Sequence, residues 1–442
     1  MEARELALKI ISEIYSKNAY ANIVLAKEIN TRYLEDQDRR FVTELVYGTI
    51  KTGETLDWIL KHYVDRPLTK IPGVILNILR LGIYQLFFLS KVPAAATCNE
   101  AVKLAKKYGH GGTVKFVNAV LRSAARSPEK VVYPDRQEQP SQHLALRYYH
   151  PEWIISRWIE RLGIDACEKL CQANNLTPPL SIRTNTLKIS RTELMKRLAS
   201  DEVVCEPSQW SPEGIVCRKF PSMNRLASLQ EGLFQVQDES SMLVAHVLDP
   251  QPGEFVIDAC GAPGGKSTHI AALMKNIGRV LSVDIHDHKS AITRQNAGRL
   301  GITIIDAKTM DAEQLDTLFA GQADRVLVDA PCSGLGVLRR KPDSRWRKTP
   351  QMLIDLPMLQ TSILNSAADC LKPGGVLVYS TCTTEPEENQ EVVCRFLASH
   401  PNYRLEETGQ FLPVKRSGEF VQLWPHIDDV DGFFIVRMVK EK

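Results

Sequence analysis

Apolar residues recur at spacings of three and four along the first 126 residues. The pattern is clearest at two places, Ala7, Ile10, Ile11, Ile14 and then Ile75, Leu79, Ile83, Leu86. This spacing puts apolar side chains on one face of a helix and predicts an all-helical domain over residues 1–130. The polar, proline-containing stretch that follows has the composition of a linker, which we place at 131–142.

Short apolar runs alternate with helical patterns in the rest of the chain. Residues 143–235 combine a helical opening with short alternating runs broken by prolines, which indicates a small α+β subdomain. From residue 236 to 442, helical patterns separate strand-like runs at 255–259, 280–284, 303–305, 325–329 and 376–380. Strands that alternate with helices usually pair in parallel. We therefore predict an α/β doubly wound, Rossmann-like domain over 236–442.

The composition is that of a soluble globular protein, with 44% hydrophobic and 24% charged residues among 442. Ten cysteines spread over so long a chain favour reduced thiols. The N-terminus lacks the layout of a signal peptide, so we expect a cytoplasmic protein. The most apolar stretch, 74–89, is interrupted by polar residues and is shorter than the about 20 residues that span a bilayer. We expect no membrane partner.

Positive charge is concentrated at one end of the chain. Residues 1–126 contain 19 Lys and Arg against 12 Asp and Glu, an excess of seven, whereas the whole chain carries only +3. Such asymmetry predicts that the front domain binds a polyanion such as nucleic acid. Ordinary solvated helix faces would produce the same excess.

A glycine-rich loop follows the first predicted strand of the α/β domain, and a helical pattern begins within it. The loop consists of Cys260, Gly261, Ala262, Pro263, Gly264, Gly265 and Lys266. Glycines let the backbone approach a ligand closely, and a helix N-terminus exposes N–H groups. Only three residues separate Gly261 from Gly265-Lys266, so the loop lacks Walker A spacing, and it also lacks the dinucleotide fingerprint G-x-G-x-x-G. The loop indicates a nucleotide-type ligand of another class.

Carboxylates follow three successive predicted strands, as Asp284, Asp311 and Asp329. Carboxyl ends of parallel strands meet at one edge of a sheet, where ligands of such folds bind. Asp284 lies about 20 residues past the glycines, where an acid can accept hydrogen bonds from ribose hydroxyls. A turn residue that caps the next helix is the alternative for Asp284, and Asp306 competes with Asp311 for the third position.

Two cysteines follow apolar runs that predict buried strands. Cys332 comes after the strand that ends at Asp329, and Cys382 follows the run at 376–380, so both belong at the rim of the site. Thr384 and Glu387 form an S/T-x-x-E pattern, which predicts a helix N-terminus that favours a thiolate at Cys382, although the neighbouring glutamates oppose it. Seven further cysteines fit an inert, buried role: Cys98, Cys167, Cys171, Cys205, Cys217, Cys370 and Cys394. None shows zinc-site spacing, so we expect no metal.

These motifs resemble the RNA (cytosine-5) methyltransferases that use S-adenosyl-L-methionine. The resemblance rests on the loop 260–266, on Asp-Ala-Pro-Cys at 329–332 and on Thr381-Cys382. Segments at 339–343, 372–375 and 431–434 are similar too, so it covers the catalytic domain. Residues 1–126 resemble the NusB-type RNA-binding domain. Together the two domains have the arrangement of the RsmB type, also called Sun or Fmu, which methylates a cytosine of 16S ribosomal RNA.

The resemblance implies a role for each candidate residue. Cys382 matches the nucleophile that adds to cytosine C6, and Cys332 matches the residue that assists release. The loop 260–266 with Asp284, Asp311 and Asp329 would bind S-adenosyl-L-methionine. The implied partner is small-subunit ribosomal RNA, bound by a monomer.

Two alternatives remain at this point, a non-catalytic RNA-binding ribosome assembly factor and a P-loop NTPase. We also expect the basic loop after Cys332 to hold the RNA backbone, through Arg339, Arg340, Lys341, Arg345, Arg347 and Lys348.

Overall fold

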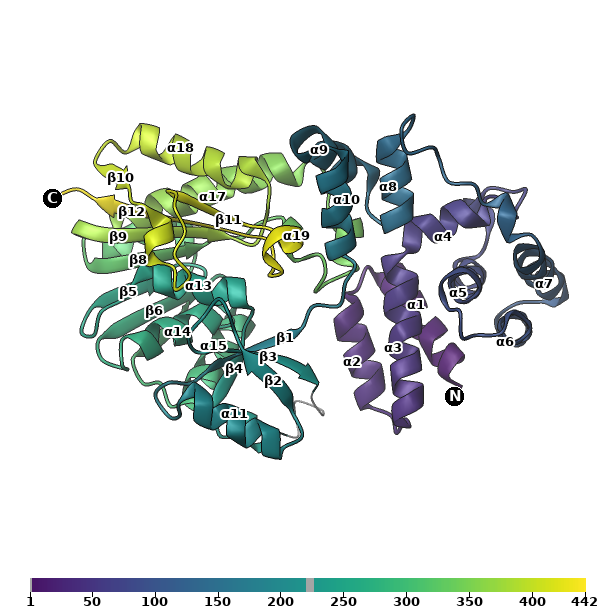
Figure 1. The fold of residues 1–442 in the computed structure, drawn as a ribbon, viewed down its shortest axis with the longest axis horizontal. Coiled ribbons are helices and arrows are strands. Elements are labelled where there is room, and N and C mark those ends of the chain that lie inside the picture. The colour runs from purple at the N-terminus through teal and green to yellow at the C-terminus, as the bar shows by residue number, and fades with distance from the viewer. Residues whose placement is uncertain (1, 220–225) are drawn as a thin grey trace. The chain divides into compact units, whose positions relative to one another are not determined.

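The chain consists of two compact units in a computed structural model that describes residues 2–219 and 226–442 (Figure 1). Unit 1 contains Met1–Asn175 together with Arg339–Arg347, and unit 2 contains Leu176–Leu338 and Lys348–Lys442. Part of the predicted α+β subdomain, 220–225, falls outside the described residues. Within the described ranges, every helix is too short or too polar to span a bilayer.

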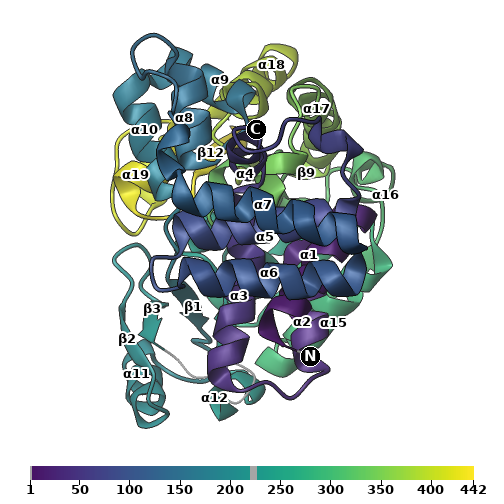
Figure 2. The ribbon, with the colours of Figure 1, turned by 90° about the vertical axis from the view of Figure 1, so that its right-hand side faces the viewer.

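The described residues of unit 1 form helices, which confirms the all-helical prediction for the N-terminal region. Its helices are α1 (Ala3–Lys17), α2 (Ala21–Asn30), α3 (Asp36–Lys51), α4 (Gly53–Leu60), α5 (Gly73–Phe88), α6 (Ala94–Tyr108), α7 (Gly111–Arg126), α8 (Pro140–Tyr148), α9 (Glu152–Leu162) and α10 (Ile164–Ala173). Figure 2 shows α5, α6 and α7 side by side. The periodic apolar residues pack in one core, where Ile10, Ile11 and Leu79 are fully buried. Burial of this apolar face supplies most of the stability of such helices.

A short segment from the second half of the chain, Arg339–Arg347, is built into unit 1. Arg345 is fully buried and donates hydrogen bonds to the carbonyl oxygens of Tyr149 and Asn174. Trp346 Nε1 donates to the carbonyl oxygen of Ile50 at 3.0 Å. The expectation that this loop holds RNA is therefore wrong for Arg345, because its guanidinium is buried and bonded to the protein.

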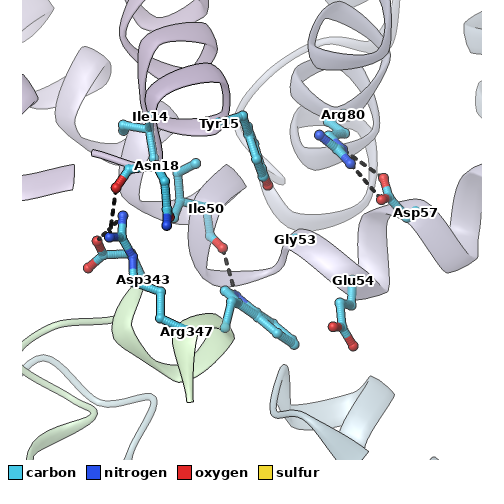
Figure 3. A pocket seen from close by; sticks show the side chains of 11 residues that line it. Ile14, Tyr15, Asn18, Ile50, Gly53, Glu54, Asp57, Arg80, Asp343 and Arg347 are labelled. Atoms are coloured by element: carbon cyan, nitrogen blue, oxygen red, sulfur yellow. Dashed lines mark hydrogen bonds and ion pairs between the residues drawn. The ribbon is translucent and has the colours of Figure 1, made fainter. Parts of the chain in front are cut away.

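Arg347 is also engaged within unit 1. It donates to the carbonyl oxygen of Asn18 at 2.9 Å and pairs with Asp343 at 3.7 Å (Figure 3). Both residues line a cavity of about 270 Å³ together with residues of α1, α4 and α5. These contacts tie the segment to the helices of unit 1 rather than leaving it as an open basic loop.

Unit 2 begins with a small antiparallel sheet. Its strands β1 (Leu180–Thr184), β2 (Val204–Pro207), β3 (Gly214–Lys219) and β4 (Phe234–Val236) pair in the order β2-β3-β1-β4. Helices α11 (Arg191–Ser200) and α12 (Ala227–Gln230) complete it. Ser190 and Glu193 form a capping box that satisfies the first N–H groups of α11. This region is the predicted small subdomain with strands and helices.

The larger sheet of unit 2 has eight strands. Strands β5 (Phe255–Asp258), β6 (Arg279–Asp284), β7 (Ile305–Thr309), β8 (Ala323–Asp329) and β9 (Leu371–Thr381) are parallel, in the order β7-β6-β5-β8-β9. Strands β10 (Tyr403–Leu405), β11 (Phe420–Leu423) and β12 (Phe433–Lys440) extend it in antiparallel fashion beyond β9. The parallel part confirms the predicted doubly wound sheet.

Helices cover both faces of this sheet. On one face lie α13 (Glu239–Leu248), α14 (Gly265–Leu273) and α15 (Asp287–Leu300), and on the other α17 (Met352–Asp369) and α18 (Gln390–Ser399) (Figure 1). The short helix α16 (Asp316–Phe319) packs in the same core as α17 and α18. A short helix, α19 (Pro425–Asp428), precedes β12. Parallel strands buried on both faces are nearly continuous in apolar residues, which explains why β5, β8 and β9 were recognisable.

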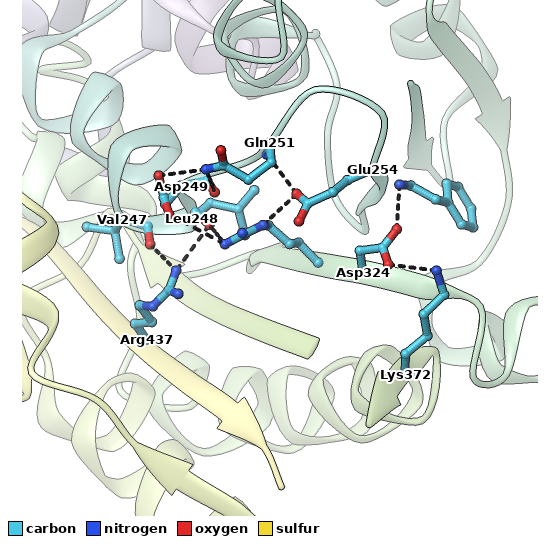
Figure 4. A network of polar contacts seen from close by, with 10 residues as sticks. Val247, Leu248, Asp249, Gln251, Glu254, Asp324, Lys372 and Arg437 are labelled. Carbon is cyan, nitrogen blue, oxygen red and sulfur yellow. Dashed lines mark hydrogen bonds and ion pairs between the residues drawn. The ribbon is translucent and has the colours of Figure 1, made fainter. Parts of the chain in front are cut away.

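Arginines fix the edge of the sheet where the parallel strands begin. Arg437 donates to the carbonyl oxygen of Val247 at 2.8 Å, and Arg325 donates to that of Leu248 at 2.7 Å and to Glu254 at 2.6 Å (Figure 4). These bonds satisfy the last carbonyls of α13, which have no partner within the helix. Arg325 lies near the start of β8, so this network is at the edge opposite to Asp329.

Candidate active site

The glycine loop lies where the order of the parallel strands reverses. Strand β5 has β6 on one side and β8 on the other, so the chain winds in opposite directions from this point. In open α/β sheets the ligand crevice forms at such a switch point, outside the carboxyl ends of the strands. The loop 260–266 follows β5, and the loop that contains Cys332 follows β8.

The loop leaves room for a ligand at the start of α14. Gly264 is the N-cap with φ +93°, which favours glycine, and a Cβ added to Gly265 would meet no atom within 4 Å. The first N–H groups of a helix have no partner within it, so they can bind an anionic or polar group. By contrast, a Cβ on Gly261 would lie 2.4 Å from Ser282 Oγ. The open space is therefore specific to the end of the loop at α14.

Asp258, the last residue of β5, stabilises the start of the helix after the glycine loop through a hydrogen bond. The sequence pattern did not identify it as a residue of the site. Its Oδ2 accepts a hydrogen bond from Ser267 Oγ at 2.7 Å, and the same hydroxyl lies 2.9 Å from Ser282 Oγ. Complete burial raises the pKa of Asp258 to about 7. A polar residue that ends an otherwise apolar strand was the available signal in the sequence.

The three predicted carboxylates lie at or just after the carboxyl ends of β6, β7 and β8. Asp284 ends β6, and its Oδ1 accepts from His286 N at 2.9 Å while Oδ2 lies 3.8 Å from Lys289 Nζ. Asp311 is the N-cap of the 3-10 turn Ala312–Gln314 after β7. Asp306 lies within β7 and pairs with Arg279 at 3.5 Å, so it is not at this edge.

Asp329 connects the two loops of the site. Its Oδ2 accepts from Lys266 Nζ at 2.7 Å, and its Oδ1 accepts from Ser380 Oγ at 2.9 Å. Lys266 also lies 5.2 Å from the centroid of the Phe433 ring, a cation–π distance. Burial lowers the pKa of Lys266, but Asp329, Asp258 and Cys382 together raise it above its ordinary value, so the ammonium group stays charged.

Cys332 and Cys382 are brought together, with their sulfur atoms 3.3 Å apart. Both are free thiols and half-buried. The hydrogen bond from Cys332 lowers the pKa of Cys382, against the effects of burial and Asp329, and Lys266 lowers it further. The hydrogen bond to Cys382 and burial raise the pKa of Cys332 well above its ordinary value, and Glu388 adds to this. Cys382 is therefore the thiol that ionises first.

A buried glutamate that sequence reasoning missed holds the Cys332 loop. Glu388 Oε1 accepts from the backbone N–H of Ser333 at 2.7 Å and from Gln360 at 3.1 Å, and Oε2 accepts from Ser333 Oγ at 2.5 Å. Gln360 also donates to the carbonyl oxygen of Pro331 at 2.9 Å. The backbone on both sides of Cys332 is thus fixed by hydrogen bonds.

Two glycines hold the cysteine loops together. Gly336 N donates to the carbonyl oxygen of Cys382 at 3.0 Å, and Gly432 N donates to that of Gly336 at 2.9 Å. A Cβ on Gly336 would lie 2.0 Å from the Gly432 carbonyl oxygen, so only glycine permits this approach. The segment Asp431-Gly432-Phe433-Phe434 has a physical role here, since it closes the loops around the thiols.

The helix N-terminus predicted after Cys382 does not form. Pro386–Glu388 is instead a 3-10 turn whose N-cap is Glu385, and α18 begins only at Gln390, with Asn389 as its N-cap. Glu388 is drawn into the protein by Ser333 instead. The thiolate of Cys382 is favoured by a neighbouring thiol and by Lys266, not by a helix dipole.

A doubly wound sheet with an open glycine loop at its switch point is the arrangement of a Rossmann-like ligand-binding domain, and the family comparisons define its class as methyltransferase. Models of known families make the assignment specific. The model for 16S rRNA methyltransferase RsmB/F matches residues 245–439, the NusB family model matches 1–126, and the ferredoxin-like domain of RsmF/B-like methyltransferases matches 150–224. The chain belongs to the 16S rRNA methyltransferase RsmB/F family.

Similar proteins cover the whole chain. The probable ribosomal RNA small subunit methyltransferase B of Bacillus subtilis is 42% identical over 99% of this chain and 98% of its own. The crystal structure of PH0851 has a TM-score of 0.83 and 27% identity, and covers 100% of this chain and 99% of its own. A methyltransferase homolog from Pyrococcus horikoshii has a TM-score of 0.60 and 30% identity, and covers 68% of this chain and 99% of its own.

Membership in a methyltransferase family implies S-adenosyl-L-methionine as the methyl donor. The residues at the switch point fit such a ligand. The space beside Gly265, the first N–H groups of α14 and the carboxylate of Asp284 can bind a nucleoside with an amino-acid tail.

Proposed function

We propose that this protein transfers a methyl group to C5 of a specific cytosine in 16S ribosomal RNA through a covalent adduct between Cys382 Sγ and C6 of the base. The observation that carries the proposal is the pair of sulfur atoms 3.3 Å apart at the ends of β8 and β9. Family membership supports the reaction class and the ribosomal RNA substrate. The covalent adduct and the C5 position go beyond what family membership supports, and both are our proposal.

The first step uses the thiolate of Cys382. Cytosine C5 is a poor nucleophile, but addition of a thiolate to C6 converts C5 into an enamine carbon. This carbon can attack the methyl group of the sulfonium donor, whose S–CH3 bond breaks and leaves neutral S-adenosylhomocysteine. The lowered pKa of Cys382 supports this role, and it has two causes in the site, the hydrogen bond with the Cys332 thiol and the positive charge of Lys266. Lys266 and Asp329 are placed to stabilise charge on the ring.

The second step uses Cys332. Once Cys382 Sγ is bonded to carbon, it loses its negative charge, and the main cause of the raised pKa of Cys332 disappears. Cys332 can then release its proton to solvent and accept the proton from C5. The electrons of that C–H bond restore the C5–C6 double bond and expel Cys382 as a thiolate. Each cysteine thus returns to its starting state after proton exchange with water.

We assign donor binding to the predicted crevice residues. S-adenosyl-L-methionine supplies a methyl group on a positively charged sulfur. The loop Cys260–Lys266 provides backbone N–H groups at the start of α14. We place the ribose at Asp284 and the adenine near Asp311, with Asp329 between the donor and the target base.

The target cytosine must leave any base-paired stem before it reaches Cys382, at a cost of a few kcal/mol. We propose that unit 1 contributes to RNA binding, since it carries the NusB-like domain with its excess of positive charge. The protein would act as a monomer.

Radiolabelled methyl transfer into ribosomal RNA from a knockout strain tests the function. We expect incorporation into 16S RNA, with 5-methylcytosine as the labelled nucleoside at one position. Label on a different atom of the base would overturn the C5 assignment. No incorporation into naked RNA or assembling subunits would favour a non-catalytic assembly factor.

A further inference from the structure

The first strand of the small sheet ends in side chains that reach the donor loop. Arg183, on β1, is 2% exposed. Its guanidinium donates to the carbonyl oxygen of Gly265 at 2.6 Å and to Thr268 Oγ1 at 3.0 Å, and it also bonds Gln237 Oε1. Gly265 is the first residue of α14, so Arg183 contacts the helix where the predicted donor loop ends.

Two further residues of the same segment hold the next helix. Asn185 Nδ2 donates to the carbonyl oxygen of Leu300 at 2.8 Å, and Lys188 Nζ donates to that of Arg299 at 3.0 Å. Both acceptors are at the end of α15, the helix that follows Asp284. The segment 183–188 therefore forms hydrogen bonds to both α14 and α15. These helices follow β5, which leads into the donor loop, and β6, which ends at Asp284.

A second contact from the small sheet reaches α14. Glu213, just before β3, has Oε1 2.5 Å from His269 Nε2 and 2.9 Å from His246 Nε2. His269 lies one helical turn after Gly265. Burial lowers the pKa of Arg183 to about 9, and the negative charge of Glu213 opposes this shift. A buried guanidinium with a carboxylate in its surroundings remains a cation at neutral pH.

We propose that Arg183 is a positioning residue for the methyl donor: it fixes the Gly265 peptide and so aims the first N–H groups of α14 into the crevice. The identity of the ligand as the donor rests on the proposed function. A hydrogen bond to the Gly265 carbonyl oxygen fixes the plane of its peptide group. Displacement of such a binding group by even about 1 Å strongly weakens its contribution to ligand positioning. The buried positive charge also favours an anionic group at this helix end.

The test compares Arg183→Met and Arg183→Lys in the full-length protein. Calorimetric titration with S-adenosylhomocysteine gives the dissociation constant, and steady-state kinetics give KM for the donor and for RNA. We expect Arg183→Met to raise the dissociation constant and the donor KM by about tenfold or more, because several charge-assisted bonds are lost. Arg183→Lys keeps the positive charge but not the forked guanidinium group, so its dissociation constant and donor KM should lie between those of the wild type and of Arg183→Met. The KM for RNA should not change.

Arg325→Met is the matched control. Arg325 is also a buried arginine that holds helix carbonyls, but at the opposite edge of the sheet. It should lower thermal stability without changing the dissociation constant of S-adenosylhomocysteine. If Arg183→Met does not fold, Thr268→Val removes the acceptor of one Arg183 bond, together with the bonds that Thr268 Oγ1 donates to the carbonyl oxygens of Gly264 and Gly265, and should raise the dissociation constant by a few-fold.

Equal dissociation constants in the Arg183, Thr268 and Arg325 variants and the wild type would overturn the inference, since Arg183 would then be merely structural. Failure of the proposed function looks different. The wild type would bind S-adenosylhomocysteine, and the Arg183 variants would weaken that binding, yet no methyl group would reach ribosomal RNA.

Discussion

At the scale of single residues, the chemistry depends on which of two adjacent thiols ionises. Cys332 and Cys382 differ little in exposure, but their charged neighbours differ. The hydrogen bond between the two thiols has the largest effect: it lowers the pKa of Cys382 and raises that of Cys332. Lys266 lowers the pKa of Cys382 further and Glu388 raises that of Cys332, whereas Asp329 raises both. The shared hydrogen bond, reinforced by Lys266 and Glu388, therefore separates the roles of the two cysteines.

Lys266→Met should raise the pKa of Cys382, because a nearby positive charge that favours the thiolate is removed. The pH profile of Cys382 alkylation by iodoacetamide, followed by mass spectrometry of that peptide, should shift upward by about one pH unit. Lys266→Arg should remain close to the wild type, and Lys372→Met, whose side chain pairs with Asp324, serves as the control. A profile in Lys266→Met identical to that of the wild type would show that Lys266 does not tune this thiol.

At the scale of elements, α14 depends on buried polar contacts as well as on apolar packing. Burial lowers the pKa of His269 to about 4, and Arg183 adds to this while Glu213 opposes it. The folded protein therefore keeps this imidazole neutral at pH values where an unfolded histidine, with a pKa near 6.5, takes up a proton.

Stability should consequently fall as the pH drops from 6.5 towards 4. In that range the unfolded chain binds more protons than the folded chain, so the free energy of unfolding falls by about 1.4 kcal/mol for each unit of pH. The free energy of unfolding should be roughly 2 kcal/mol lower at pH 5 than at pH 7. Urea unfolding of unit 2 at several pH values measures this. His269→Gln should flatten the dependence, and a variant that keeps the wild-type slope would assign the effect to other groups.

Element patterns in the sequence predicted the buried strands but not every tertiary partner. Strands β5, β8 and β9 were readable because they are apolar on both faces. The sequence pattern predicts a strand at 303–305, whereas the observed strand, β7, spans Ile305–Thr309. It is the edge strand of the sheet and contains two charged residues with partly exposed side chains, Asp306 and Lys308, which pair with each other. A local pattern hides such an edge strand.

The candidate site shows the same limit. The positions of Cys332 and Cys382 after apolar runs identified them as neighbours, and the structure places their sulfur atoms in contact. Glu388 was not recognisable, because its partner Ser333 is 55 residues away in sequence. Arg183 was missed for the same reason, since Gly265 is 82 residues away.

At the scale of the whole molecule, unit 1 contains a short segment that is far away in the sequence from its other residues. The loop between β8 and α17 enters unit 1 as Arg339–Arg347 and is held there by Arg345. Burial lowers the pKa of Arg345 to about 10, so it remains a cation with backbone carbonyls as partners. The segment that follows Cys332 in the chain is thereby part of the fold of the NusB-like unit.

Arg345→Met should destabilise unit 1 by about 3 kcal/mol, because it leaves the carbonyl oxygens of Tyr149 and Asn174 without their donor. Hydrogen exchange should increase around residues 149–150 and 174–175, and the thermal midpoint should fall. Lys341→Met, at an exposed position of the same segment, should change neither. Unchanged exchange in Arg345→Met would show that the segment does not stabilise this unit.

The central claim is that Cys382 attacks the base and Cys332 releases it. Incubation of each cysteine variant with ribosomal RNA and S-adenosyl-L-methionine, followed by denaturing electrophoresis, measures this directly. Cys332→Ala should accumulate a covalent protein–RNA adduct that survives denaturation, because the methylated intermediate cannot lose its C5 proton. Cys382→Ala should form no adduct. An adduct in Cys382→Ala and none in Cys332→Ala would exchange the two roles, and no adduct in either variant would contradict the covalent mechanism.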